Sequence, residues 1–147
     1  MNLESRLEKL LKQHGLRITR PRQLVFEFLI NAKEPVKLRQ VIALHGVWAD
    51  RASLYRTVKL FQELGIIKEV HRSGGAWLEL GETFSGHHHH ITCSGCGITQ
   101  NVTSAKVEAQ LDEIARQAGY SVIDHQFEIT GCCPDCLALA ASKQVSA

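Results

Sequence analysis

Residues 87–96 read HHHHITCSGC, in which four consecutive histidines are followed by two spacer residues and a Cys-x-x-Cys motif. Successive side chains on a β-strand point to opposite faces of the sheet. An extended backbone therefore directs His87 and His89 to one face and His88 and His90 to the other. We expect this single strand to supply ligands to two separate metal sites.

A second Cys-x-x-Cys motif lies in GCCPDC, residues 131–136. Four thiolates in two such pairs predict a structural Zn²⁺ site, because four protein ligands leave no open position for a substrate. A redox pair would need a helix N-terminus in a βαβ fold, and we expect neither pair to have that context. The fifth cysteine, Cys132, is expected to be a small buried residue and not a ligand. The predicted zinc ligands are Cys93, Cys96, Cys133 and Cys136.

Two more residues of the same half, Glu108 and His125, have side chains that bind metal ions. With His87 and His89 they form an N₃O donor set. Such a set suits Zn²⁺, or with added water Fe²⁺ or Mn²⁺.

His88 and His90 face the other way, toward the first half of the chain, where Glu79 is the nearest carboxylate in the sequence. A metal ion held by these three residues would bridge the two halves, so we interpret them as a sensor site that acts as a switch. The alternative for Glu79 is an ordinary solvent-facing position on a strand.

Charge is distributed unevenly along the 147 residues. Residues 1–84 carry 14 Lys and Arg against 9 Asp and Glu, a balance of +5, whereas residues 85–147 carry 3 against 6, a balance of −3. The first half is therefore the candidate for binding a polyanion. No apolar run reaches the ~20 residues of a membrane span, and the N-terminus lacks the apolar core of a signal peptide, so we expect a cytoplasmic protein.

The pattern of residues 1–84 predicts a winged helix. Apolar residues recur at helical spacing before Gly15, after Pro21, in residues 37–45 and in residues 51–64, and Asp50 is placed to cap the last of these helices. Residues 66–70 and 76–80 then read as two strands joined by a glycine-rich turn. Helices followed by a β-hairpin are typical of this DNA-binding fold.

The helix over residues 51–64 is expected to be the recognition helix. Its outer face carries basic and aromatic side chains, and a second basic cluster precedes the helix that follows Pro21. A solvated helix face is the alternative. The predicted DNA-binding residues are Ala52, Tyr55, Arg56 and Lys59 on the helix, and Arg17, Arg20 and Arg22 in the basic cluster.

The second half reads as a small ββαβ module. After the histidine strand we expect a strand over residues 98–102, a helix over 105–118 and a strand over 120–130. A module of this size has a thin core and exposed strand edges, which favours a homodimer. The predicted fold class is α+β. A winged helix-turn-helix DNA-binding domain at 1–82 and a hinge at 83–86 precede an α/β dimerisation domain with a four-cysteine zinc site at 87–147.

Several of these segments together resemble the ferric uptake regulator family over nearly the whole chain. The matching stretches are GLRITRPR, ASLYRTV followed by LGII, the HHHHITCSGCG block, and DHQFEITG with its Cys-x-x-C motif. The resemblance implies a homodimeric winged-helix repressor that uses a metal ion as co-repressor and binds AT-rich palindromic operators. It also implies that Arg17 enters a minor groove and that Tyr55 and Arg56 lie on the recognition helix.

The resemblance further implies a role for each ligand set. The four paired cysteines correspond to the family's structural zinc site, the set with Glu108 to a site in the dimerisation domain, and the set with Glu79 to the hinge sensor. Many members have Asp where this chain has His89, and many supply a further sensor histidine before the third helix. Here Glu34 or His71 is the candidate for that ligand.

The identity of the sensed metal stays open between zinc and iron. An imidazole at His89 in place of a carboxylate favours Zn²⁺ over the harder Fe²⁺ or Mn²⁺, so a zinc uptake regulator is our first interpretation, with iron sensing next. A peroxide sensor of the same family is the alternative. A metal-dependent hydrolase or thiol oxidoreductase would need an open metal position beside a general base, and it would leave the winged helix unexplained, so we expect no enzyme.

Overall fold

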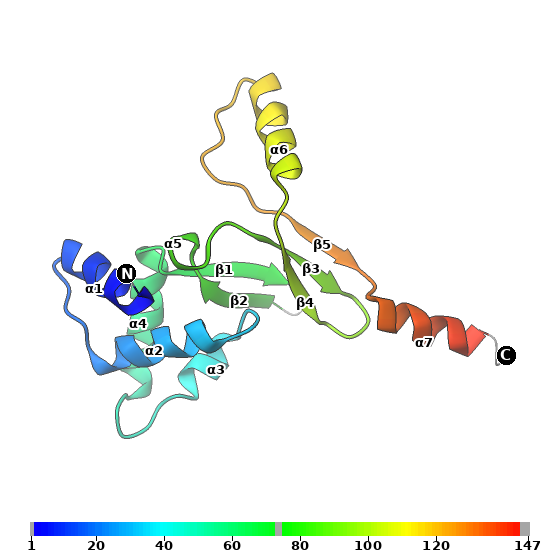
Figure 1. The fold of residues 1–147 in the computed structure, drawn as a ribbon. Coiled ribbons are helices and arrows are strands. Elements are labelled where there is room, and N and C mark those ends of the chain that lie inside the picture. Colours follow the sequence, from blue (N-terminus) through cyan, green and yellow to red (C-terminus); the bar gives the residue numbers. More distant parts are fainter. Residues whose placement is uncertain (1, 73–74, 145–147) are drawn as a thin grey trace. The chain divides into compact units, whose positions relative to one another are not determined.

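The chain divides between Gly86 and His87 into two units, in a computed structural model that describes residues 2–72 and 75–144 (Figure 1). Each unit has its own sheet: two strands in the first and three in the second. No helix within the described residues is long and apolar enough to cross a membrane.

The first unit begins with four helices and a β-hairpin, as the sequence predicts. Side chains set two of the helix starts, since Asn2 accepts from the Ser5 N–H at 2.8 Å and Asp50 accepts from the Ser53 N–H at 2.9 Å. The third helix is shorter than the predicted 37–45. The elements are α1 (Leu3–Gln13), α2 (Arg20–Asn31), α3 (Leu38–Ile42), α4 (Arg51–Glu63), β1 (Ile67–Arg72) and β2 (Gly75–Leu80).

One apolar core holds these elements together. Most of its largest fully buried side chains come from α1, α2 and α4, among them Leu11, Phe26 and Phe61, and Val41 of α3 and Ile66 complete the set. The hairpin is attached by a short bridge in which Val36 and Leu78 exchange backbone hydrogen bonds of 2.8 and 2.7 Å. The wing is therefore fixed to the helices of its own unit.

A single helical turn, α5 (Glu82–Ser85), closes the first unit, and the sequence analysis missed it. Phe84 is buried there, with its ring centroid 5.0 Å from that of Phe26, and the Arg6 guanidinium lies 5.5 Å from the Phe84 ring centroid. Arg6 also donates to the Thr83 carbonyl. Two of the four residues expected to be a hinge, Thr83 and Phe84, thus contact α1 and α2.

The second unit is a three-stranded sheet with the order β4-β3-β5. Strand β3 (His89–Cys93) pairs antiparallel with β4 (Thr99–Val102) and parallel with β5 (Glu128–Gly131). Helix α6 (Ala105–Gln117) connects β4 to β5 and is capped by Ser104, whose hydroxyl accepts from the Val107 N–H at 3.4 Å.

The strand predicted over 120–130 is wrong for most of its length. Strand β5 pairs residue by residue with His90–Cys93, and this segment of β3 is only four residues long. Residues 120–127 run beyond the start of β3, where no neighbouring strand of the described chain pairs with them. Their alternating pattern therefore has no partner, and they form an irregular segment.

A final helix, α7 (Pro134–Gln144), was also missed. Proline is well suited to the first turn of a helix, because backbone N–H groups there have no acceptor within the helix and proline lacks this group. The Leu-Ala run that follows is strongly helix-forming. The second cysteine pair therefore does lie at a helix N-terminus, contrary to our expectation. The surrounding sheet is nonetheless not the βαβ arrangement of a redox motif.

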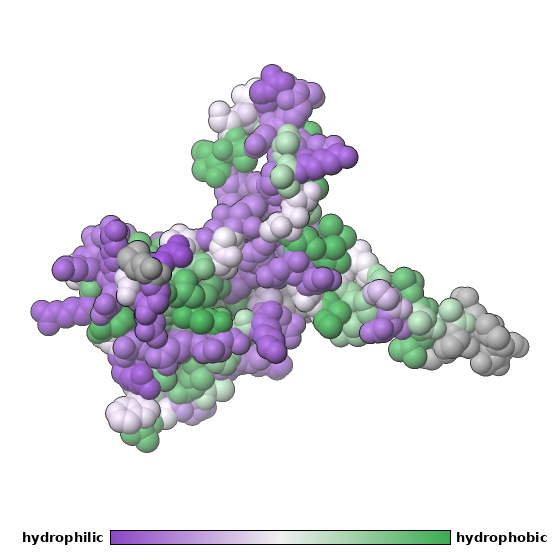
Figure 2. All heavy atoms as spheres, viewed as in Figure 1, coloured by the Kyte–Doolittle hydropathy of each residue, from purple (hydrophilic) through white to green (hydrophobic). Residues whose placement is uncertain are grey.

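The second unit exposes much of its apolar surface. None of the residues of α6, all of which the structure describes, is fully buried. Figure 2 shows hydrophobic residues at the surface of α7, where the exposed fractions are 57% for Leu137 and 62% for Leu139. Few contacts within this unit's own chain therefore fix α6 and α7.

Phe84→Ala is expected to lower the free energy of unfolding of the first unit by about 3 kcal/mol, because it removes a buried aromatic ring from its contact with Phe26. Urea unfolding followed by circular dichroism measures the change. Phe84→Leu is the matched control and should cost roughly half as much, since it keeps much of the volume. An alanine variant as stable as the parent would show that residues 83–86 are a free linker.

Candidate functional site

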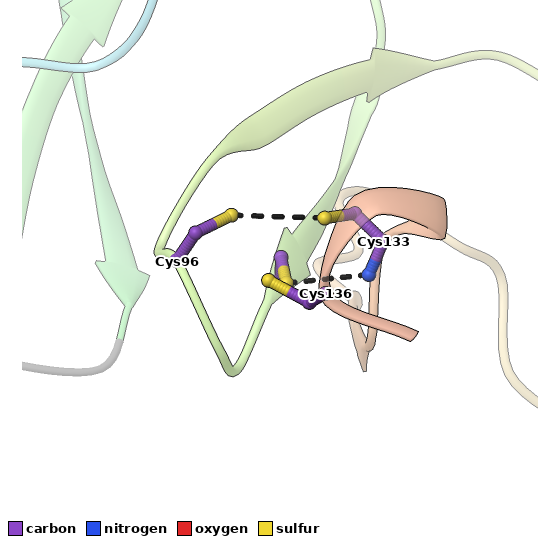
Figure 3. A group of neighbouring side chains, drawn as sticks. Cys96, Cys133 and Cys136 are labelled. Carbon is purple, nitrogen blue, oxygen red and sulfur yellow. Dashed lines mark hydrogen bonds between the residues drawn. The ribbon is translucent and has the colours of Figure 1, made fainter. Parts of the chain in front are cut away.

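Four cysteines of the second unit converge on one point. Cys93 ends β3, Cys96 lies in the turn after it, and Cys133 and Cys136 lie at the start of α7. In Figure 3 the sulfurs of Cys96, Cys133 and Cys136 face the same space, and the Sγ atoms of Cys96 and Cys133 are 3.7 Å apart. All four sulfurs are within 4.8 Å of one another.

This spacing fits a tetrahedral zinc ion. A Zn–S bond of about 2.3 Å places the sulfurs of a regular tetrahedron about 3.8 Å apart. The distance between Cys96 and Cys133 matches that edge. Cys132 is exposed and is not one of the four, so the expectation that it is buried is wrong. It precedes Cys133 outside both Cys-x-x-Cys pairs.

Backbone hydrogen bonds within the cysteine cluster favour the thiolate form of Cys93. The Cys133 N–H donates to the Cys93 sulfur at 3.2 Å, and this bond, with further backbone bonds from Cys96 and Gly95, lowers the pKa of Cys93 to about 5. Hydrogen bonds with the sulfurs of Cys133, Cys93 and Cys96 raise the pKa of the Cys136 thiol, and burial and the repulsion of a neighbouring negative charge add to this effect. A divalent cation removes that repulsion, so metal binding here is coupled to proton release.

Gly95 leaves the room that this cluster needs. A Cβ atom at this position would lie 2.9 Å from the Cys136 sulfur and 3.2 Å from its Cβ. The turn between the first two cysteines therefore requires a residue without a side chain. The sequence shows this glycine, but only the position of Cys136 gives the reason for it.

Three histidines and one glutamate form a second cluster in the same unit. His89 begins β3 and His87 lies two residues before it, Glu108 is in the first turn of α6, and His125 is in the segment before β5. The Nε2 atoms of the three imidazoles are 3.1, 3.2 and 3.4 Å apart. The Glu108 carboxylate lies 2.8 Å from His89 Nε2 and 2.9 Å from His125 Nε2.

A cation fits this arrangement better than hydrogen bonding among the residues does. A Zn–N bond of about 2.0–2.1 Å sets the edges of a tetrahedron at roughly 3.3–3.4 Å, close to the observed separations. Three imidazole nitrogens that face one another cannot all be satisfied by their own protons, whereas three lone pairs suit one metal ion. The hydrogen bond from His89 lowers the pKa of Glu108, and the neighbouring His87 and His125 add to this effect. The carboxylate is thus ready to act as an anionic ligand.

Phe127 holds one of these ligands in place, and the sequence analysis did not single it out. Its ring stacks on the His89 imidazole at a centroid distance of 3.8 Å and an angle of 28°. His89 is 4% exposed, so the stacked pair is shielded from water. Phe127 follows His125 by two residues. In extended backbone this spacing directs both side chains the same way, so the spacing is the signal in the sequence for their shared position.

The alternation of the histidine run has the predicted consequence for the other two members. The ring centroids of His88 and His90 are 5.0 Å apart, and neither residue belongs to the cluster around Glu108. Glu79, on β2, belongs to the first unit, and Glu34 is exposed in that unit. The side chain of His71, the other candidate ligand, lies outside what the structure describes.

The predicted DNA-contact residues gather at the beginnings of α2 and α4. Arg22 and Arg56 line one groove of about 460 Å³ between these helix ends, together with Thr19, Pro21, Ser53, Thr57 and Leu60. Arg17, Arg20, Ala52, Tyr55 and Lys59 are exposed. A cationic groove beside the N-terminus of a helix suits a phosphate backbone.

The groove's arginines are held by neighbouring groups. Arg56 donates to the Ser53 hydroxyl at 2.9 Å, and that hydroxyl donates to Asp50 at 2.6 Å. These bonds from Ser53 lower the pKa of Asp50, so it stays ionised as the cap of α4. Arg22 donates to the Arg17 carbonyl. Both guanidinium groups are therefore oriented before any ligand arrives.

Known proteins of one family match the chain in sequence and in fold. The sequence model of the ferric uptake regulator family matches residues 13–130. A ferric uptake regulation protein of Neisseria meningitidis serogroup A is 34% identical over 133 residues, which cover 87% of this chain and 91% of the relative.

Solved structures agree. The ferric uptake regulator of Helicobacter pylori, described as having three functional metal-binding sites, superposes with a TM-score of 0.75 at 23% identity and covers 93% of this chain and 95% of its own. The regulator of Francisella tularensis with iron gives a TM-score of 0.66 at 25% identity, with coverage of 84% and 96%.

Gly95→Ala is expected to reduce zinc retention by the four cysteines, since the added methyl group meets the Cys136 sulfur. The readout is zinc released to a chromogenic chelator during a fixed incubation at neutral pH. Ile98→Ala, which removes an exposed side chain just after the same turn, is the control and should release zinc at the parental rate. Equal release from both variants would contradict the close approach at Gly95.

Phe127→Ala is expected to weaken metal binding at the histidine and glutamate cluster by about tenfold, because His89 loses the ring that orients it. Isothermal titration with Zn²⁺ and Co²⁺, with the cysteine site kept filled, measures the affinity. Phe127→Tyr preserves the stacked ring and should bind as the parent does. If the alanine variant also keeps its affinity, Phe127 has no positioning role.

Proposed function

Because the chain belongs to the ferric uptake regulator family, we propose that a metal ion acts as its co-repressor, raising its affinity for operator DNA through the histidine residues of the second unit. It is a metal-responsive transcriptional regulator of metal homeostasis and not an enzyme. The observation that carries the proposal is the convergence of three imidazoles and a carboxylate at the histidine run, whose other two members are His88 and His90.

Each ligand set has a separate proposed role. The four cysteines hold a structural Zn²⁺ that fixes α7 to the end of β3. The cluster with Glu108 holds a regulatory ion within the dimerisation domain. In the hinge set, Glu79 comes from the DNA-binding domain and His88 and His90 come from the dimerisation domain. The domain limits 1–82, 83–86 and 87–147 remain predictions.

The switch follows from that division of the hinge ligands. A metal ion bound by residues of both domains fixes the angle between them, and it thereby sets the spacing of two recognition helices in a dimer. A metal ion shifts the equilibrium between the two domain arrangements only to the extent that it binds the DNA-competent arrangement more tightly. A tenfold difference in metal affinity stabilises that arrangement by about 1.4 kcal/mol. Fixing the angle between the two domains on metal binding is therefore enough to change operator occupancy.

Zinc is the favoured co-repressor. The cluster with Glu108 offers three imidazoles to one carboxylate, and its donor separations are close to those of a tetrahedral zinc site. Iron is the second candidate, because the similar Francisella tularensis regulator is described with iron. Manganese would need added water ligands at the same site.

The partner is double-stranded DNA bound by a homodimer. Regulators of this family are typically dimeric, and the exposed apolar surface of the second unit supports a second copy. A two-fold symmetric protein reads two half-sites, so the proposed operator is palindromic, and by family resemblance it is AT-rich. Reaching such an operator requires a cytoplasmic protein, and we propose no membrane partner.

Replacing both His88 and His90 with alanine is expected to remove the metal dependence of DNA binding while the cysteine-bound zinc and the dimer persist. Fluorescence anisotropy measures binding to a duplex selected from a random library by the zinc-loaded parent, during separate titrations with Zn²⁺, Fe²⁺ and Mn²⁺. The parent should gain at least about tenfold in affinity with its own metal.

His14→Ala is the matched control, since it removes an exposed imidazole whose hydrogen-bond partner among the described residues is the Leu10 carbonyl of α1, at 2.9 Å. It should retain the metal response. Elemental analysis and sedimentation confirm zinc content and assembly in every variant. A double variant whose DNA affinity still rises with metal as the parent's does would refute the switch.

A further inference from the structure

An exposed apolar tip precedes the recognition helix, and none of the roles given above uses it. Val47 and Trp48 are 93% and 68% exposed. They are the two central residues of a turn in which Gly46 and Ala49 exchange backbone hydrogen bonds of 2.9 and 3.4 Å. Two large apolar side chains are thus held outward by a closed turn.

The turn is firmly joined to α4. Ala49 is buried, and the next residue, Asp50, caps the helix through the Ser53 N–H. The tip therefore has a fixed position relative to the first turn of α4. In a helix-turn-helix the N-terminal residues of the recognition helix meet the base edges, so a rigid segment just ahead of them lies beside the same groove.

Charge around the tip matches a polyanion. The Arg20 guanidinium lies 6.0 Å from the centroid of the Trp48 ring, and Arg20 also pairs with Glu27 at 3.8 Å. Arg51 begins α4 and is exposed. The nearby Asp50 is already engaged by Ser53. An apolar tip flanked by arginines fits a surface with phosphates on its rim and apolar groups within.

We propose that Val47 and Trp48 form an additional DNA-contact element that packs on apolar groups of the duplex, either thymine methyl groups in the major groove or deoxyribose on its wall. Thymine methyls are the apolar feature of the major groove and are contacted by apolar side chains. This inference rests on the proposed DNA-binding function and adds a source of sequence preference to it. Arg20 then holds the indole ring and has a guanidinium available for a neighbouring phosphate.

Trp48→Ala is expected to weaken binding to the selected duplex by about tenfold at saturating metal, as for the loss of one well-buried apolar contact. Val47→Ser should weaken it less, and Trp48→Phe should recover most of the loss. Glu63→Ala, at the other end of α4, is the matched control and should bind as the parent does. Anisotropy on a duplex with one operator is the measurement.

Two further arms identify the contact. Uracil in place of thymine removes the methyl groups. If this replacement lowers the DNA affinity of the parent but not that of Trp48→Ala, the tip contacts a thymine methyl group. If Trp48→Ala binds more weakly than the parent but uracil leaves the parent's affinity unchanged, the tip contacts deoxyribose. In a Trp77→Phe background Trp48 is the sole tryptophan, and DNA should protect its fluorescence from acrylamide. This arm needs no substitution at Trp48.

The outcomes separate this inference from the switch. Unchanged affinity in Trp48→Ala together with unprotected Trp48 fluorescence would overturn it. A loss seen only on long DNA with several operators would mean that the tip contacts a neighbouring dimer, which also overturns it. A parent that binds the duplex equally with and without metal would refute the proposed co-repressor, while the comparison at Trp48 would stand.

Discussion

Three imidazole nitrogens that face one another at 3.1–3.4 Å are the arrangement on which the second unit depends. Each nitrogen has one lone pair or one proton, so the three cannot satisfy one another, and the adjacent Glu108 supplies a negative charge. A cation resolves both problems together. The cluster joins the start of β3, the first turn of α6 and the segment before β5, which share few other buried contacts.

With the proposed ions bound, the second unit relies on metal ligands where a larger domain relies on an apolar core. None of the residues of α6, all of them described, is fully buried, and α7 exposes its leucines. The four cysteines hold the start of α7 against the end of β3, and the histidine cluster holds α6 against the other end of that strand. Small domains commonly compensate for a thin core with metal ions or a partner subunit. In this proposal the same two sets of ligands stabilise the second unit and make its structure depend on bound metal.

The first unit shows the opposite design. A continuous apolar core of helices and hairpin supports a surface on which Arg56, Ser53 and Asp50 are already linked by hydrogen bonds. Oriented guanidinium groups lose less side-chain entropy when they bind phosphate. In the proposed mechanism, binding of DNA needs no rearrangement within this unit, and the metal ion acts on the angle between the two units.

The sequence by itself determined the first four helices and the hairpin of the first unit, the alternation of the histidine run and the two cysteine pairs. These features depend on local periodicity, capping residues and short spacings, which act within a few positions of the chain. Tertiary structure alone decided that residues 120–127 are not a strand, because a strand needs a neighbour and β3 offers only four residues to β5. It also decided that Phe84 is packed against Phe26, that Phe127 stacks on His89 and that Gly95 must make room for Cys136. Such contacts join positions far apart in the chain, and no local pattern records which of them will meet.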